Sequence, residues 1–252
     1  MKWHPLLSPS TLIRFIASAA LINLSALSLA GEDLTPSGTN PTPRTIEYPW
    51  MSVATWDKMY AEDIAVAEQG GIDLLFVGDS ITAGWNPDIW QKNFSQYRPA
   101  NFGIGGDHTG NLLWRLKYGH AEKLSPKLVV LLIGVNNFGH LNETPRQVFA
   151  GVKANVNQLR KLYPNANILV NAVFPYEEKA SSPKRALVKE ANALIATLND
   201  NKRIFVKDYG SHFLQADGSI SKDIMADFLH PTAKGYQIWA DVMLPDIQNL
   251  IN

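Results

Sequence analysis

The stretch Leu128-Val-Val-Leu-Leu-Ile133 contains no polar residue. An apolar run of strand length without alternation is typical of a β-strand covered on both faces. Similar runs lie outward along the chain at 72–77, 100–102, 168–173 and 203–206, and segments with helical periodicity separate them. Strands that alternate with helices predict right-handed crossovers. The sequence therefore predicts an α/β fold with a central parallel sheet and helices on both of its faces.

Three helix starts can be located from capping residues. Thr144-Pro145 and Ser182-Pro183 each combine an N-cap side chain with a proline at the first helical position. A last helix is predicted to begin near Thr232. We expect an interruption at Pro245, because proline lacks the amide hydrogen that a helix interior requires.

Composition and charge limit the function classes. The chain has 252 residues, 23 basic against 23 acidic side chains, and no cysteine. A content of 46% hydrophobic and 18% charged residues is that of a globular protein. Without cysteine there are no disulfides, thiolate metal sites or cysteine nucleophiles. The balanced charge predicts no nucleic-acid partner, since that affinity comes largely from Lys and Arg on phosphates.

The N-terminal residues differ from the rest. Lys2 and Arg14 precede an apolar run at 15–29, which small residues end. This pattern predicts a signal peptide at 1–30 and hence export to the periplasm or the medium. An uncleaved membrane anchor is the alternative, although about fifteen apolar residues are short for a bilayer span. Residues 31–49 are interpreted as a flexible linker or an extended lead-in, and residues 50–252 as a single domain with no further membrane span.

Gly78-Asp79-Ser80 follows the first predicted strand. In parallel sheets, functional loops lie beyond the carboxyl ends of the strands. A serine that enters a helix there can present its hydroxyl beside backbone N–H groups, which stabilise an anion. The alternative is that Asp79 or Ser80 only caps the next helix. The segment is not the G-x-S-x-G elbow of the α/β-hydrolases, because Thr82 stands where the second glycine belongs.

Three glycines, Gly103, Gly105 and Gly106, follow the second predicted strand and predict tight turns or a close backbone approach. A dinucleotide fingerprint fails because His108 occupies the third glycine position. A P-loop fails because Asn111 replaces the required lysine. The residues thus exclude both nucleotide interpretations, and spacing alone does not say which glycine serves a site.

Two further polar groups are candidates. Asn136 follows the third predicted strand and could donate a hydrogen bond into a site there, with an Asn-rich turn as the alternative. Asp227 and His230 stand three residues apart, so the carboxylate can hold the imidazole tautomer that leaves one nitrogen free as a base. An incidental surface pair is the other interpretation. The other histidines have no metal-ligand spacing, and we predict no metal and no cofactor.

Together these residues resemble a known family. Four sequence blocks of the SGNH (GDSL-type) hydrolases have counterparts in the same order: Gly78-Asp79-Ser80, Gly106, Asn136 and Asp227-x-x-His230. The resemblance spans about 74–244. Segments 101–107, 113–116 and 227–230 are most similar to the catalytic subunits of platelet-activating factor acetylhydrolase and their secreted bacterial relatives. Asn137 stands where the commonest family pattern has Asp, a departure that the acetylhydrolase branch tolerates.

The resemblance implies a three-layer α/β/α flavodoxin-like fold and a role for each residue. Ser80 would be the nucleophile, His230 the base and Asp227 the group that orients it. The oxyanion hole would consist of the backbone N–H groups of Ser80 and Gly106 and the side-chain amide of Asn136. Gly106 is chosen over its neighbouring glycines by its match to the family motif.

The predicted function is an exported serine esterase that hydrolyses short-chain, in particular acetyl, esters of a carbohydrate or lipid through an acyl-serine intermediate. The acetyl preference rests on the resemblance. Two alternatives stay open: a long-chain lipase or thioesterase of the same family, and a non-catalytic glycan-binding module on the same fold. The expected partner is a small-molecule or glycan ester. Close family members pair, which adds a homodimer as an option.

Overall fold

The computed structural model describes residues 37–119 and 121–252. The predicted signal peptide at 1–30 lies outside the described residues, as does the first part of the segment 31–49. No helix within the described residues is long and apolar enough to cross a membrane.

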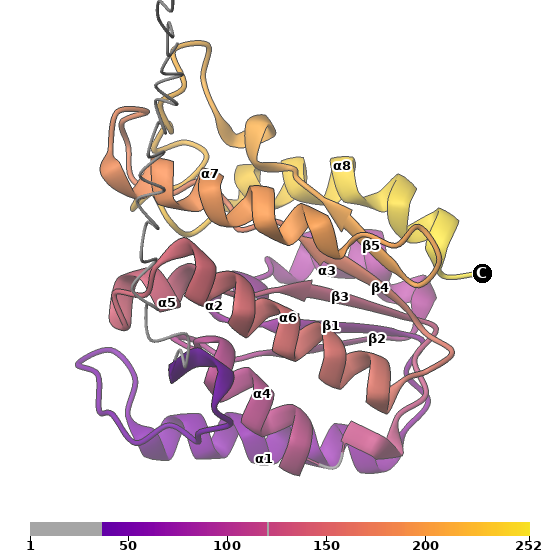
Figure 1. Cartoon of the computed structure of the whole chain (residues 1–252). Helices are drawn as coiled ribbons and strands as arrows, with labels where there is room; N and C mark the ends of the chain where they lie inside the picture. The colour runs from indigo at the N-terminus through magenta and orange to yellow at the C-terminus, as the bar shows by residue number, and fades with distance from the viewer. Residues whose placement is uncertain (1–36, 120) are drawn as a thin grey trace, which may run out of the picture. The chain divides into compact units, whose positions relative to one another are not determined.

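One parallel sheet organises the described residues, and its strand order is β2-β1-β3-β4-β5 (Figure 1). The strands are β1 Leu74–Gly78, β2 Pro99–Gly103, β3 Leu128–Leu132, β4 Asn167–Asn171 and β5 Ile204–Lys207. Every strand predicted from the sequence is present, with ends displaced by at most two residues. The chain crosses from β1 outward to β2 and then returns past β1 to β3, so the switch point lies between the ends of β1 and β3.

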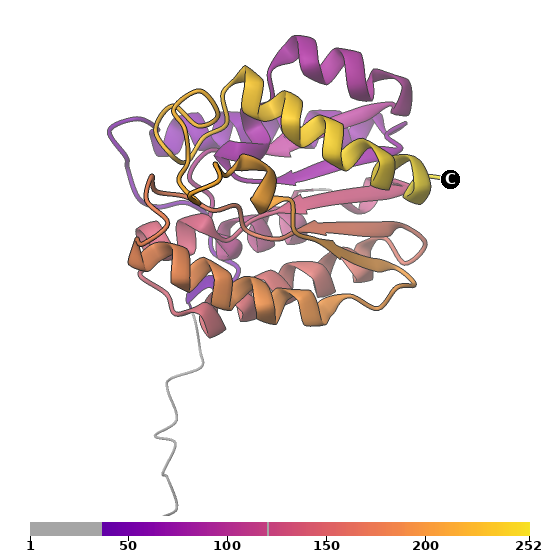
Figure 2. The same ribbon diagram turned by 90° about the horizontal axis from the view of Figure 1, so that it is seen from above.

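Helices cover both faces of the sheet (Figures 1 and 2). Helices α1, α4, α6 and α7 lie on one face, and α3 and α8 pack against each other on the opposite face. Their bounds are α1 Val53–Gln69, α2 Ser80–Ala83, α3 Pro87–Phe94, α4 Thr109–Tyr118, α5 Val135–His140, α6 Pro145–Leu162, α7 Pro183–Ile195 and α8 Ala233–Leu250. The short 3-10 helices are η1 Ser37–Thr39, η2 Ser95–Tyr97, η3 Ala121–Lys123, η4 Ala196–Leu198 and η5 Gly210–Phe213. This three-layer arrangement confirms the predicted fold class.

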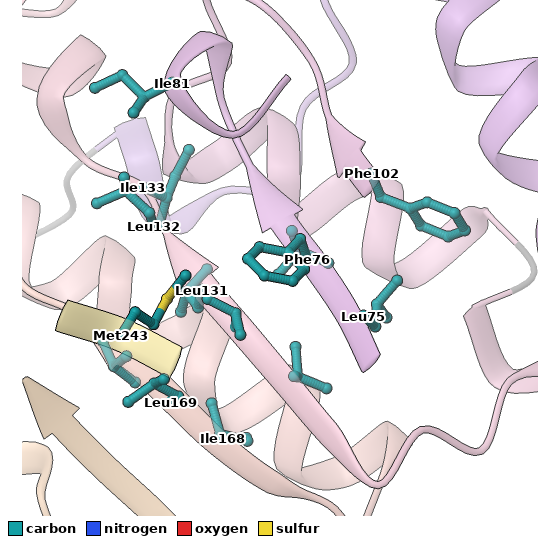
Figure 3. Close-up of a cluster of buried hydrophobic side chains, with 14 of the residues drawn as sticks. Leu75, Phe76, Ile81, Phe102, Leu131, Leu132, Ile133, Ile168, Leu169 and Met243 are labelled. Atoms are coloured by element: carbon teal, nitrogen blue, oxygen red, sulfur yellow. The ribbon is translucent and has the colours of Figure 1, made fainter. Parts of the chain in front are cut away.

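The core lies on the central strands (Figure 3). Every residue of β1 and β3 is buried, as the wholly apolar run in β3 predicted. Phe76 of β1 and Leu131 of β3 project into the same cluster, and Met243 of α8 closes it (Figure 3). A rigid central sheet follows, and its carboxyl edge can hold side chains in fixed positions.

The predicted helix starts are confirmed, but the predicted interruption of the last helix is wrong. Thr144, Ser182 and Thr232 each accept a hydrogen bond from a backbone N–H in the first turn. Helix α8 continues through Pro245 to Leu250. Its C-terminal turns stay packed because Ile247 is fully buried, and this burial offsets the hydrogen bond that proline cannot make.

The described part of the predicted linker is not a free linker. From Ser37 onward the chain is an extended lead-in that packs on the domain. The Thr42 N–H donates to the Gly110 carbonyl at 3.1 Å, and the side chain of Arg44 is buried. The flexible-linker interpretation failed because the segment is anchored by polar contacts to residues about 60 positions away, which local composition does not report.

Gly151 permits the close approach of α6 to α4. A Cβ at this position would stand 2.2 Å from the Oγ1 atom of Thr109. We expect Gly151→Ala to lower the free energy of unfolding by about 1–3 kcal/mol, as overpacking of a tight contact does. Gly139→Ala is the matched control: a Cβ there meets nothing within 4 Å, and alanine favours a helix. Thermal unfolding of both variants measures this, and equal melting temperatures would contradict it.

Candidate active site

The first strand delivers Ser80 to the carboxyl edge of the sheet. Strand β1 ends at Gly78, where a Cβ would stand 2.2 Å from the carbonyl oxygen of Leu132. Asp79 caps α2, since its Oδ1 accepts the Ile81 N–H at 3.0 Å. Ser80 is the first residue of the helix and is half-buried. The capping interpretation is therefore correct for Asp79. As a result, the Ser80 hydroxyl lies at the N-terminus of α2.

His230 reaches Ser80 from the other end of the chain. The Ser80 Oγ atom lies 2.9 Å from His230 Nε2, and His230 Nδ1 lies 2.6 Å from Asp227 Oδ2. The three side chains thus form one hydrogen-bonded row. The Asp227–His230 pair is consequently not an incidental surface pair.

The turn that carries Asp227 and His230 has an unusual backbone. Phe228 adopts a positive φ of 61°, which is uncommon for a bulky residue. Asp227 Oδ1 accepts the backbone N–H groups of Leu229 at 3.1 Å and His230 at 2.8 Å. The Phe228 carbonyl accepts the Glu177 N–H at 2.9 Å. These bonds hold the turn in a conformation that points His230 at Ser80 and Asp227 at His230.

The acidic member of this row is open to solvent, with 56% of the Asp227 side chain exposed. Partial burial raises its pKa, but hydrogen bonds from the His230 ring and from nearby backbone N–H groups outweigh that effect and hold the pKa below its usual range. The carboxylate is therefore ionised at neutral pH and accepts a proton-bearing Nδ1. This assignment leaves the Nε2 lone pair of His230 directed at the Ser80 hydroxyl.

Two further candidate groups come from the segments that follow the neighbouring strands β2 and β3. Gly106 has a φ of 73°, and a Cβ there would stand 2.5 Å from the Trp50 ring. Gly103 serves packing instead, because a Cβ there would stand 2.3 Å from the Ala83 nitrogen. The Asn136 amide is buried in α5 and donates to the Asp107 carbonyl at 2.9 Å. An amide nitrogen carries two hydrogens, so one Asn136 N–H can still be donated to an anion.

Asn137, at the position where the family pattern has Asp, is a buried structural residue. Its Oδ1 accepts the Thr109 N–H at 3.0 Å, and its Nδ2 donates to Thr109 Oγ1 at 2.7 Å and to Glu143 Oε2 at 2.8 Å. These bonds fix α4 against α5. The departure from the family pattern therefore falls beside the site and not on one of its reacting groups.

A buried ionic network underlies the loop after β2, and it was not predicted from the sequence. Both carboxylate oxygens of Asp107 are occupied: Oδ2 accepts from Arg115 Nε at 2.8 Å and Oδ1 from Trp56 Nε1 at 2.7 Å. Arg115 also donates to the Gly78 carbonyl at 3.1 Å. Arg44 of the lead-in donates to the Gly105 carbonyl at 2.7 Å. Arg115, through Asp107, and Arg44, through the Gly105 carbonyl, thus both anchor the loop that carries Gly106.

A serine, an imidazole and a carboxylate in a hydrogen-bonded row at the carboxyl edge of a parallel sheet are the arrangement of a serine hydrolase. A sequence profile of the GDSL-like lipase/acylhydrolase family matches residues 76–238. The chain belongs to this family, and it is a carboxylic ester hydrolase.

Curated relatives agree with this assignment. Platelet-activating factor acetylhydrolase IB subunit alpha1 of Rattus norvegicus is 34% identical over 205 residues, which are 79% of this chain and 87% of that protein. The alpha2 subunit of Gallus gallus is 37% identical over 165 residues, 65% of this chain and 71% of that protein.

Solved structures share the fold. A GDSL-like lipase from Bacteroides thetaiotaomicron superposes with a TM-score of 0.61 at 20% identity, over 78% of this chain and 98% of that chain. An acetylxylan esterase from Geobacillus stearothermophilus gives a TM-score of 0.56 at 19% identity, over 72% and 96% of the two chains. These matches confirm the SGNH-type α/β/α architecture.

The buried carboxyl group of Asp79, which caps the helix of Ser80, makes the stability of the fold depend on pH. Asp79 is fully buried, and within the described residues its Oδ2 has no hydrogen-bond partner. Burial raises its pKa to about 7, although the Ile81 N–H lowers it in part. The folded pKa thus lies above the unfolded value of 3.8, so this group destabilises the fold increasingly as pH rises from about 4 through about 7.

We therefore expect Asp79→Asn, which keeps the capping oxygen, to melt near the wild-type temperature at pH 4 and above it at pH 8. A gain on the order of 2 kcal/mol corresponds to about 4–8 °C. Melting curves across this pH range measure the difference. A variant that is less stable than the wild type above pH 7 would show that the ionised Asp79 stabilises the fold.

Proposed function

We propose that this protein is an exported serine esterase that hydrolyses short-chain, in particular acetyl, carboxylic esters. The distance of 2.9 Å between Ser80 Oγ and His230 Nε2 carries the proposal, because it lets the imidazole remove the hydroxyl proton during attack. Export is proposed on the sequence of residues 1–30 alone.

The reaction would proceed in two steps. Ser80 Oγ attacks the ester carbonyl carbon while its proton passes to His230 Nε2, and Asp227 stabilises the imidazolium. Collapse of the tetrahedral intermediate breaks the bond to the alcohol, which leaves with that proton. Water then attacks the acyl-Ser80 carbonyl carbon while His230 takes one of its protons. The bond between the acyl group and Ser80 Oγ breaks, His230 returns the proton to Oγ, and the acid is released. The two steps consume one ester and one water molecule and need no oxidant, reductant or group donor.

Three donors would stabilise the oxyanion of each tetrahedral intermediate. They are the backbone N–H groups of Ser80 and Gly106 and the side-chain amide of Asn136. Two arise from a helix N-terminus and a left-handed turn, and the third is positioned by its bond to the Asp107 carbonyl. Donors fixed before the reaction stabilise developing charge without reorganisation, and each is worth on the order of 3 kcal/mol.

The acetyl preference is supported by relatives whose names describe acetyl ester hydrolysis. A cavity of about 830 Å³ lies between α7 and the chain after β5, but neither Ser80 nor His230 lines it. That cavity therefore does not contain the proposed nucleophile or base, and it carries no argument for a long acyl chain. A long-chain lipase or thioesterase is the second candidate within the family, and acyl length separates it from the proposal.

The first test uses p-nitrophenyl esters of increasing acyl length. We expect the acetyl ester to be hydrolysed fastest, and Ser80→Ala and His230→Ala each to lose about 10³-fold or more in kcat, since the row acts as a unit. Ser125→Ala, which changes an exposed serine outside the site, is the control and should retain wild-type rates. A wild type that prefers long acyl chains would favour the lipase. Full activity in Ser80→Ala, or a wild type without activity on any ester, would overturn the catalytic assignment in favour of another nucleophile or a binding module.

The oxyanion assignment has its own test. We expect Asn136→Ala to lower kcat by about 10²–10³-fold with little change in KM, because its amide would act on the transition state. Steady-state kinetics on the acetyl ester measure the split, and thermal unfolding checks that α5 stays folded. A loss confined to KM would mean that Asn136 binds substrate and does not stabilise the oxyanion.

A further inference from the structure

Trp50 is a large apolar side chain that the fold leaves exposed, at 58% of its surface. It lies in a closed turn at the junction of the lead-in and the domain, where Tyr48 and Met51 exchange backbone hydrogen bonds, each of 3.1 Å. In Figure 1 this indigo segment reaches the same end of the sheet as α2 and α5. An exposed aromatic ring held by a closed turn at the active edge is a candidate binding surface.

Trp50 borders Gly106, one of the proposed oxyanion donors, and the helix α5 that carries another. Its ring stands 2.5 Å from the position that a Cβ of Gly106 would occupy. The same ring lies 6.2 Å, centroid to centroid, from His140, which is one helical turn after Asn136 in α5. Since the Gly106 N–H is a proposed oxyanion donor, the ring lies near the place where a substrate carbonyl would bind, and groups attached to that carbonyl could reach it.

The ring is also held rigid. It stacks on Tyr48 at 4.9 Å with an angle of 5° between the planes, and Tyr48 Oη lies 3.1 Å from His140 Nδ1. The guanidinium of Arg44 lies over the Tyr48 ring at 5.1 Å. A ring fixed in advance loses little conformational entropy when a ligand stacks on it.

We propose that the exposed face of Trp50 binds the neutral pyranose ring that carries the ester, so that the acyl acceptor is a carbohydrate. This inference rests on the esterase function proposed above and specifies its substrate class. The C–H groups on one face of a pyranose form a flat apolar surface that matches an indole, while its hydroxyls remain in water at this open position.

Charge argues against a cationic headgroup at the same position. An aromatic face attracts a quaternary ammonium through cation–π interaction. Here, however, the buried Arg44 guanidinium stands 2.9 Å from the same hypothetical Gly106 Cβ that Trp50 approaches. A second positive charge beside it would be repelled, and a neutral sugar would not.

The test compares acetylated xylooligosaccharide, ethyl acetate and acetylcholine as substrates by acid release. We expect Trp50→Ala to lower kcat/KM on the oligosaccharide, mainly through KM, and to lower its ratio to the ethyl acetate value by about 5–10-fold, which is the strength of one aromatic stack. Trp50→Phe should restore part of the ratio. Tyr118→Ala, which removes a ring of similar exposure from the far end of α4, should leave both values unchanged.

The outcomes separate the two proposals. A wild type inactive on all three substrates overturns the esterase function and this inference with it. An active wild type whose ratio is unchanged in Trp50→Ala overturns the stacking alone, and a loss confined to acetylcholine assigns the ring to a cationic headgroup. Should Trp50→Ala fail to fold, oligosaccharide added to the Ser80→Ala variant must protect tryptophan fluorescence from acrylamide, and no protection rejects the proposal.

Discussion

The buried ion pair between Arg115 and Asp107 is the contact on which the site depends. Its atoms lie 2.8 Å apart, and both side chains are almost wholly excluded from water. The same guanidinium bonds the end of β1 through the Gly78 carbonyl and reaches Asp63 of α1 at 3.1 Å. Loss of one partner from such a pair leaves an uncompensated buried charge, which typically costs about 3–5 kcal/mol. The ends of β1 and β2 are therefore fixed to each other before any substrate arrives.

This pair also explains why the lead-in belongs to the site. Asp107 carries one negative charge between two guanidinium groups, because Arg44 lies 3.4 Å from its Oδ1. The second arginine comes from the lead-in, so the segment that carries Trp50 is anchored to the loop that carries Gly106. A polar network buried beneath a loop restricts its conformations more than apolar packing would, since each bond has a direction.

The sequence predicted the fold because the fold depends on local pattern. The apolar run at 128–133 predicts a strand, and the caps at Thr144 and Ser182 predict helix starts, from a few neighbouring residues alone. Local pattern did not predict that α8 continues through Pro245 or that the segment from Ser37 to Pro49 packs on the domain. In both places distant burial decides the outcome: α8 is held by its packing, and the lead-in by Arg44. Local propensity is a weak guide wherever tertiary contacts oppose it.

The sequence predicted which residues form the site, but not how their side chains are arranged relative to one another. Ser80 and His230 could be matched to motifs, yet their contact joins positions 150 residues apart. The positive φ of Phe228 and the position of the Trp50 ring leave no signature in the sequence. The Phe228 carbonyl bonds the distant Glu177 N–H, and Trp50 stacks on Tyr48, whose hydroxyl contacts the distant His140.

The site is divided into a buried half and an open half. Two of the donors proposed for the oxyanion, Gly106 and Asn136, are buried, whereas His230 and Asp227 keep 41% and 56% of their side chains exposed. Electrostatic stabilisation is strongest where water is excluded, so the buried half is where the developing negative charge belongs. Proton transfer tolerates solvent, because His230 must also meet the water that completes the reaction. An alcohol can then leave through the open half while its ring stays on Trp50, which places the specificity for the acceptor outside the reacting core.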